Sequence, residues 1–187
     1  MSGLLDFQGF LNEEKKQTYD YGCSMVFLSA PELQKLQASI LHEDLQGKGL
    51  EDEPHVTLLY GIHSNEVKDS EIMELSRPAL DTPIVLRNVS LFENPDFDVL
   101  KFEADGPILF EINRRLTALP HTTDFPEYKP HATIAYLKPG AGQKYVKAFA
   151  GINCTCNPLK IVYSKPDGSR VEETHEQGMH SVVPESK

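Results

Sequence analysis

The sequence predicts an α+β fold in which two β-α-β-α-β units are related by a pseudo-two-fold axis, with antiparallel sheets that face a central cleft. Two observations predict this fold. Strand-like apolar runs alternate with segments of helical periodicity. The pattern then recurs at one ungapped offset of 76 residues, which carries Pro31 onto Pro107 and His55 onto His131. A duplicated unit tends to pack symmetrically, so we expect the two histidine strands to meet.

The first unit opens with an apolar strand and continues with a helix that begins at Pro31. Leu33, Leu36 and Ile40 fall on one face of this helix, and Gly47 lies where a C-terminal cap is expected. The elements expected in this unit are a strand at 22–29, the helix from Pro31, the strand that contains His55, a helix at 66–80 and a strand at 83–89.

The second unit follows a turn at Asn94-Pro95-Asp96. Its first helix begins at Pro107 and places Leu109, Ile112 and Leu116 on its apolar face. The elements expected here are a strand at 97–104, that helix, the strand that contains His131, a short helix at 143–149 and a strand at 159–164, with a last strand at 169–174 after the turn at 165–168.

These elements predict a single domain with two lobes. We expect an N-terminal extension at 1–20, the domain at 21–175 with repeat units at about 22–90 and 97–165, and a flexible C-terminal tail at 176–187. A monomer is expected.

Composition limits the function. The formal net charge is −10, whereas proteins that hold long nucleic acids present basic surfaces, so long RNA or DNA is not expected as a partner. No apolar run is long enough to cross a bilayer, and no signal peptide is evident. Three cysteines leave one without a partner in any disulfide scheme. These features favour a cytoplasmic protein without membrane contact, in the host cell if the chain is viral.

The repeated motif is H-x-T, present as His55-Val56-Thr57 and His131-Ala132-Thr133. Residues i and i+2 of a strand point to the same face, so each motif presents one imidazole and one hydroxyl together. Two imidazoles can share general acid and base work at neutral pH, and hydroxyls can stabilise charge on a phosphate. One histidine per strand is too few for a typical zinc or iron site. The pattern therefore predicts phosphodiester chemistry that does not require a metal.

The two motifs, HVTL and HATI, resemble the signature of the 2H phosphoesterase superfamily, whose members share a bilobal, LigT-like fold. The resemblance implies a catalytic set of His55, Thr57, His131 and Thr133, and no metal or other cofactor. The stretches YDYGCSMVFLSAPE and EPHVTLLYG are also similar to the phage anti-CBASS phosphodiesterases. That narrower resemblance implies a small cyclic di- or trinucleotide as substrate, with Tyr21 stacked on a base.

Alternatives remain within this interpretation. One is an RNA 2′,3′-cyclic or 2′-5′ phosphodiesterase, and another is a nucleotide-binding module without turnover. Tyr60 and Tyr136 either line the cavity or belong to the core, and Lys129 and Lys138 either offset substrate charge or are solvated. The other five histidines have no counterpart at the 76-residue offset and are expected to be non-catalytic: His42, His63, His121, His175 and His180.

Overall fold

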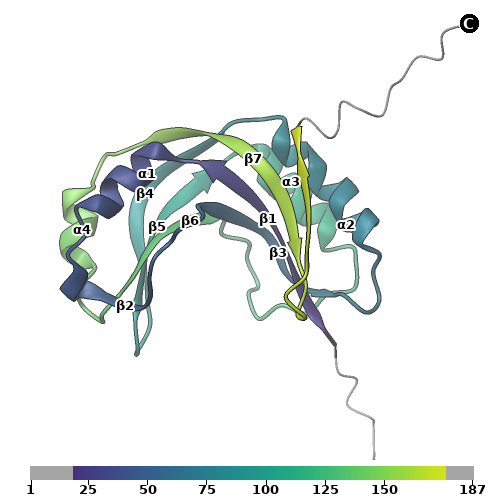
Figure 1. Cartoon of the computed structure of the whole chain (residues 1–187), viewed down its shortest axis with the longest axis horizontal. Helices are drawn as coiled ribbons and strands as arrows, with labels where there is room; N and C mark the ends of the chain where they lie inside the picture. Colours follow the sequence, from purple (N-terminus) through teal and green to yellow (C-terminus); the bar gives the residue numbers. More distant parts are fainter. Residues whose placement is uncertain (1–18, 176–187) are drawn as a thin grey trace, which may run out of the picture.

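The computed structural model describes residues 19–175, which form an arch with helices at both of its ends (Figure 1). Eight strands make one antiparallel sheet in the order β1-β3-β6-β5-β4-β7-β8, with β2 paired to β6. The strands are β1 (Tyr21–Ser29), β2 (Leu45–Leu50), β3 (His55–His63), β4 (Ile84–Glu93), β5 (Asp98–Asp105), β6 (His131–Leu137), β7 (Cys154–Ser164) and β8 (Arg170–Thr174).

The longest strand, β7, joins the two ends of the arch. It pairs with β4 through Cys154, Thr155 and Cys156, and with β1 through the rest of its length. The path of pairing therefore closes on itself through β1, β3, β6, β5, β4 and β7. We call β1, β3, β8 and the later part of β7 the first half-sheet, and β2, β4, β5 and β6 the second half-sheet.

Helices cover each half-sheet on its outer side. The helical segments are α1 (Pro31–Ala38), η1 (His42–Asp44), α2 (Asp69–Ser76), η2 (Arg77–Leu80), α3 (Pro107–Leu116) and α4 (Gln143–Ala148). Helices α2 and α3 pack against strands of the first half-sheet, whereas α1 and α4 pack against β6 and β4 of the second (Figure 1). Each half-sheet is therefore covered by one helix from each sequence repeat.

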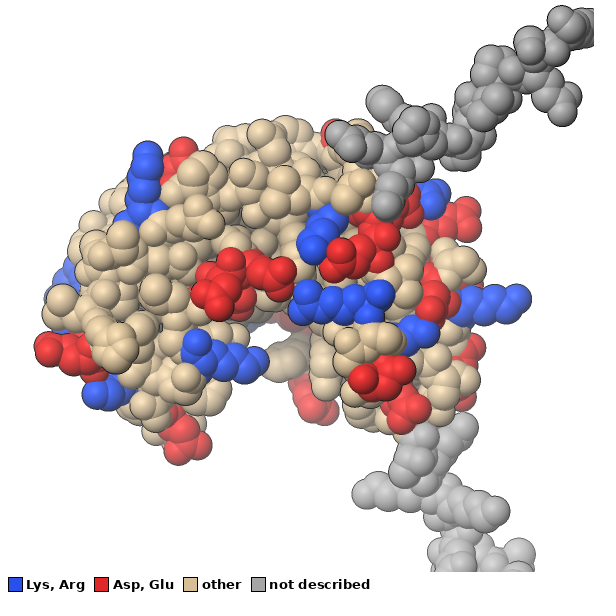
Figure 2. Space-filling view, in the orientation of Figure 1, with Lys and Arg blue, Asp and Glu red and all other residues tan. Residues whose placement is uncertain are grey.

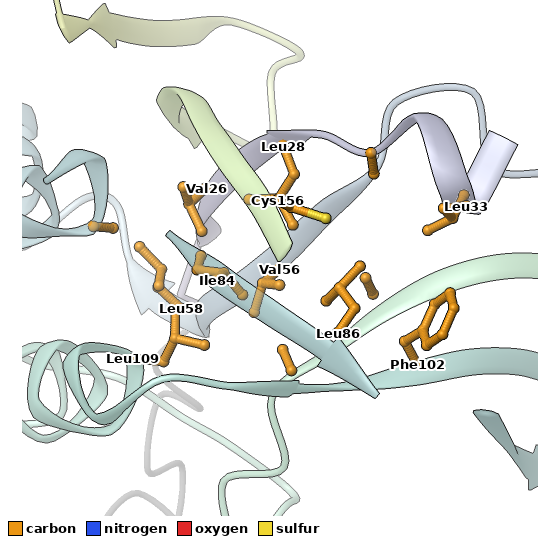
Figure 3. Close-up of a cluster of buried hydrophobic side chains, with 14 of the residues drawn as sticks. Val26, Leu28, Leu33, Val56, Leu58, Ile84, Leu86, Phe102, Leu109 and Cys156 are labelled. Atoms are coloured by element: carbon orange, nitrogen blue, oxygen red, sulfur yellow. The ribbon is translucent and has the colours of Figure 1, made fainter. Parts of the chain in front are cut away.

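The main core is formed by the side chains on the helix-covered face of both half-sheets. Val26, Val56, Leu86 and Phe102 are all fully buried and converge from four different strands (Figure 3). Leu109 of α3 joins the same cluster, as its helical periodicity predicts. Because this burial fixes one face of β1, β3, β5 and β6, the alternate residues of those strands must face away from the core.

The structure follows the expected elements closely but corrects several boundaries. The first helix ends at Ala38, and Gly47 lies in β2 with φ +56°, so the cap predicted at Gly47 is wrong. Strand β2 has no counterpart in the sequence prediction. Strand β7 begins at Cys154, five positions before the expected strand, because Cys154 and Cys156 are buried against β4.

The 76-residue offset holds for strand pairing in the centre of the sheet. Met25 pairs with Thr57 and, at that offset, Lys101 pairs with Thr133. Both pairings are followed by a bulge, at Leu58 in β3 and at Ile134 in β6. The third strand of each repeat crosses to the other half-sheet, since β4 pairs with β5 and β7 with β1. The repeat units are thus interleaved in the structure.

Candidate active site

The two histidine strands lie side by side along the inner side of the arch (Figure 1). They are antiparallel and meet at the pair Val56–Ala132. Both of these residues are fully buried in the core, so their neighbours point to the opposite face. The register then sets His55 beside Thr133 and Thr57 beside His131. Space-filling shows the molecule hollowed between its two ends on this side (Figure 2).

Each imidazole is held by a hydrogen bond to the backbone carbonyl two residues before it. Nδ1 of His55 lies 2.8 Å from the carbonyl oxygen of Glu53, and Nδ1 of His131 lies 2.8 Å from that of Lys129. A carbonyl can only accept, so Nδ1 carries the proton in each ring. Nε2 is therefore the nitrogen through which either histidine can take or give a proton, as acid–base chemistry requires.

An aromatic ring packs against each histidine. Phe27 of β1 lies 5.3 Å from the His55 ring, and Phe92 of β4 meets the His131 ring edge-on at 5.0 Å. Phe27 belongs to a small second hydrophobic cluster with Met25 and Val162. These contacts fix the orientation of both rings and remove part of their surface from water.

The threonines are held differently. The carbonyl oxygen of Thr57 accepts a hydrogen bond from the Tyr128 hydroxyl at 2.8 Å, and its side chain lies beside Cys23, a thiol whose pKa is raised by burial to about 11. Thr133 is buried beside Lys101 of β5. The two H-x-T motifs are therefore equivalent in register but not in surroundings.

Electrostatics distinguish the second motif. Burial holds the pKa of His131 below its usual value; the hydrogen bond to the Lys129 carbonyl opposes this, and positive charge on Lys101 or His55 adds to it. The pKa of Lys101 is itself lowered, chiefly by burial. The lowered pKa favours the neutral form of His131, the protonation state that a general base needs.

Aromatic side chains form a matching pair at each end of the site. Tyr21 and Tyr60 lie with ring centroids 6.4 Å apart at 54°, while Phe97 and Tyr136 lie 6.1 Å apart at 58°. The offset of 76 residues converts one pair into the other. Tyr60 is 55% exposed, Tyr21 37% and Phe97 36%, so these rings do not belong to the core.

The two lysines suggested by the sequence lie outside this arrangement. Lys129 is exposed and pairs with Glu127 at 3.7 Å. Lys138 is also exposed and follows the far end of β6, where its amide donates to the Asp44 carbonyl. Neither side chain has a contact with the H-x-T residues among those recorded for residues 19–175. The backbone of Lys129, through its carbonyl, does contact the site.

The remaining histidines have other surroundings. His63 is buried, with Nδ1 at 2.6 Å from Glu66 and Nε2 at 2.8 Å from Thr122, and it anchors the loop before β6. His42 is exposed, His121 bonds the Leu119 carbonyl, and His175 lies 3.7 Å from Asp81. His180 lies outside the described residues, as do the predicted C-terminal tail and nearly all of the N-terminal extension.

Sequence reasoning missed several residues that face the site. Lys101, Phe27, Phe92 and Phe97 were not expected there. Phe97 could have been predicted from the sequence, because it lies at the position equivalent to Tyr21 in the second repeat. The others come from β1, β4 and β5, whose pairing beside the histidine strands depends on the sheet order and not on local sequence.

Within residues 19–175, no group of three or more His, Cys, Asp or Glu side chains is arranged to hold a metal ion. In the same part of the chain, no helix is long and apolar enough to cross a membrane. Together, the α+β fold and the paired imidazoles and hydroxyls describe a site suited to acid–base chemistry on an oxyanion.

Comparisons with known proteins give a likeness in structure but none in sequence. No protein-family model matches the chain, and no curated protein matches its sequence. A structure of LigT from E. coli, complexed with phosphate, is similar with a TM-score of 0.42 and 11% identity over 84% of this chain and 95% of that one.

Proposed function

We propose that the protein is a phosphodiesterase of the 2H type, which uses His55 and His131 as its acid–base pair and needs no metal. One observation carries this proposal: two adjacent strands present an imidazole and a hydroxyl each to one face, with both Nδ1 atoms held by carbonyl groups. In the same proposal, the two repeats are related by a pseudo-two-fold axis that passes between β3 and β6.

In the proposed reaction, His131 acts as the base. Its Nε2 takes the proton of a ribose 2′-hydroxyl, and the 2′-oxygen attacks the adjacent phosphorus. The bond from phosphorus to the 5′-oxygen breaks, and Nε2 of His55 donates a proton to that oxygen. The products are a 2′,3′-cyclic phosphate and a 5′-hydroxyl, and water can open the cyclic phosphate afterwards. Thr57 and Thr133 donate hydrogen bonds to the non-bridging oxygens, where charge increases in the transition state.

The aromatic pairs favour a substrate with a base on each side of the phosphate. Exposed aromatic rings stack on bases of any identity, at about 1–3 kcal/mol per base. The Tyr21–Tyr60 pair and the Phe97–Tyr136 pair belong to opposite half-sheets. A dinucleotide or cyclic oligonucleotide can occupy both pairs, whereas a mononucleotide 2′,3′-cyclic phosphate can occupy only one.

We therefore propose 3′-5′ linked cyclic di- or trinucleotides as substrates. The net charge of −10 also favours a compact ligand held in a local site over a long strand. Degradation of such immune signals is the role that the resemblance to phage anti-CBASS enzymes implies, and we include it in the proposal.

A substrate panel tests the proposal. Purified protein is incubated with 3′,3′-cGAMP, cyclic trinucleotides, 2′-5′ oligoadenylate and 2′,3′-cyclic mononucleotides, with and without EDTA, and the products are separated by chromatography. We expect cleavage of the cyclic oligonucleotides, unaffected by EDTA. Cleavage of the mononucleotides or of 2′-5′ linkages alone would assign the chain to RNA processing, and binding without any product would contradict the enzyme.

A further inference from the structure

Lys101 is a buried lysine on which one carboxylate, Glu103 of the same strand, acts at longer range without forming a recorded salt bridge. Its side chain is only 6% exposed, and none of the ion pairs recorded within residues 19–175 contains it. One hydrogen bond runs from its Nζ to Ser90 Oγ at 2.7 Å, and the same Nζ lies 4.3 Å from the centre of the Phe92 ring. Burial of an ammonium group is costly unless an anion compensates it.

The position of Lys101 relates it directly to the candidate active site. It pairs across the sheet with Thr133 on one side and with Ser90 on the other. Its ammonium group and the His131 imidazole both contact the Phe92 ring. A phosphate bound by Thr133 and His131 would therefore lie beside this cation.

The equivalent place in the first half-sheet is apolar. Met25 corresponds to Lys101 at the 76-residue offset and pairs with Thr57. The neighbour of Met25 on β7 is Val162, where Lys101 has Ser90.

Two cations, Lys160 and Arg170, do lie over the Phe27 ring beside His55, at 5.1 and 5.7 Å. Each is paired with a carboxylate, Glu172 and Glu53 respectively. The two sides therefore differ in that the cation on the His131 side, Lys101, is in no recorded ion pair within residues 19–175.

Resting on the proposed function, we infer that Lys101 is an additional catalytic residue that binds a non-bridging oxygen of the scissile phosphate. Its charge is compensated when the phosphodiester enters, and it stabilises the further negative charge of the transition state. Because it lies on the His131 side, it also orients the substrate, with the attacking 2′-oxygen at His131 and the leaving 5′-oxygen at His55.

The test replaces Lys101 by methionine, the residue type at the equivalent position of the first repeat, Met25. Lys101→Met removes the charge and retains an apolar stem, so the fold should survive, which circular dichroism and the melting temperature will verify. We expect kcat to fall by about 10²-fold. Lys147→Met, which removes an exposed lysine of α4 and changes net charge equally, should keep kcat within about threefold of wild type.

A binding measurement separates this inference from the proposed function. Inorganic phosphate is titrated into wild type and Lys101→Met while the imidazole signals are followed by NMR. We expect the dissociation constant to rise at least about tenfold in the variant. If wild type cleaves none of the substrates, the proposed function fails, yet this titration still decides the role of Lys101. A folded Lys101→Met protein that binds phosphate like wild type would overturn the inference.

Discussion

Gln37 and Asn113, which are related by the 76-residue offset, donate corresponding hydrogen bonds from their side-chain amides to the two histidine strands. Asn113 Nδ2 donates to the carbonyl of Leu58 at 2.7 Å, and Gln37 Nε2 donates to the carbonyl of Ile134 at 2.9 Å. Leu58 and Ile134 are the extra residues of the two bulges, which directly follow Thr57 and Thr133. A bulge leaves its residue without a ladder partner, so the Asn113 amide provides the Leu58 carbonyl with a donor. The Ile134 carbonyl accepts both the Gln37 side chain and the backbone amide of Glu51, the latter at 3.1 Å.

This relationship predicts that Asn113→Leu and Gln37→Leu destabilise the protein and weaken the site. A buried carbonyl without a donor costs about 1–3 kcal/mol, which is the loss expected for Asn113→Leu at the Leu58 carbonyl. Gln37→Leu should cost a similar amount, because the Glu51 carbonyl loses its donor at 2.7 Å while the Ile134 carbonyl keeps the Glu51 amide. Chemical denaturation measures the change. Gln34→Leu, at an exposed position of the same helix as Gln37, is the control and should leave the free energy of unfolding nearly unchanged. Equal stability of all three variants would contradict the role given to the bulges.

The histidines give a second prediction. His55→Ala and His131→Ala should each lower kcat by about 10²–10⁴-fold, since each removes one proton transfer, while both proteins remain folded. The double variant should lose little more than the worse single one, because the two groups act as a unit. His42→Ala, an exposed histidine outside the site, provides the control. Full turnover by either single variant would exclude the two-histidine mechanism.

The grouping of each histidine with its threonine could be predicted from the sequence because it is local. His55 and Thr57 share a face wherever a strand forms, and the same holds for His131 and Thr133. The 76-residue repeat predicts that the two strands meet. In the structure they pair at Val56–Ala132, which sets each histidine beside the threonine of the other motif. The sequence therefore predicts that the two H-x-T motifs share one site.

The surroundings of the site could not be predicted in the same way. Gly47 was expected to cap a helix, but it lies in β2, which pairs with β6 through Leu45 and Leu50. Lys101 has an ordinary strand position in the sequence, and only its pairing between Ser90 and Thr133 shows that its charge is buried. Such features depend on sheet order, which local periodicity does not encode.

The aromatic pairs give a third prediction. Tyr21→Ala and Phe97→Ala should each raise KM for a cyclic dinucleotide by roughly tenfold or more, because each loses a stacking surface of about 1–3 kcal/mol. The readout is steady-state kinetics with matched substrates. For a 2′,3′-cyclic mononucleotide, at most one of the two substitutions should matter. Phe125→Ala, in a loop where the ring is 74% exposed, should change neither KM. Unchanged KM values in both pair variants would remove the support for a two-base substrate.

The lowered pKa of His131 predicts where activity falls in acid. The base must be neutral, so kcat/KM declines as pH drops through the pKa of His131, and a lowered pKa moves that decline below about pH 6.5. The charges that act on this ring are those of Lys101 on β5 and His55 on β3. Glu103 faces His131 through the pairing of β5 with β6, and Lys129 precedes it by two residues.

Glu103 provides the sharpest check of this sign, because it pairs directly with His131 across the sheet. Its carboxylate favours the protonated imidazole, so Glu103→Gln should lower the pKa of His131 further and move the acid limb of kcat/KM to lower pH. NMR titration of the imidazole measures the same pKa without substrate. Glu71→Gln, on the exposed side of α2, should move neither quantity. An acid limb that stays in place in Glu103→Gln, while the pKa of His131 measured by NMR falls, would show that His131 is not the base, and the roles of the two histidines would be exchanged.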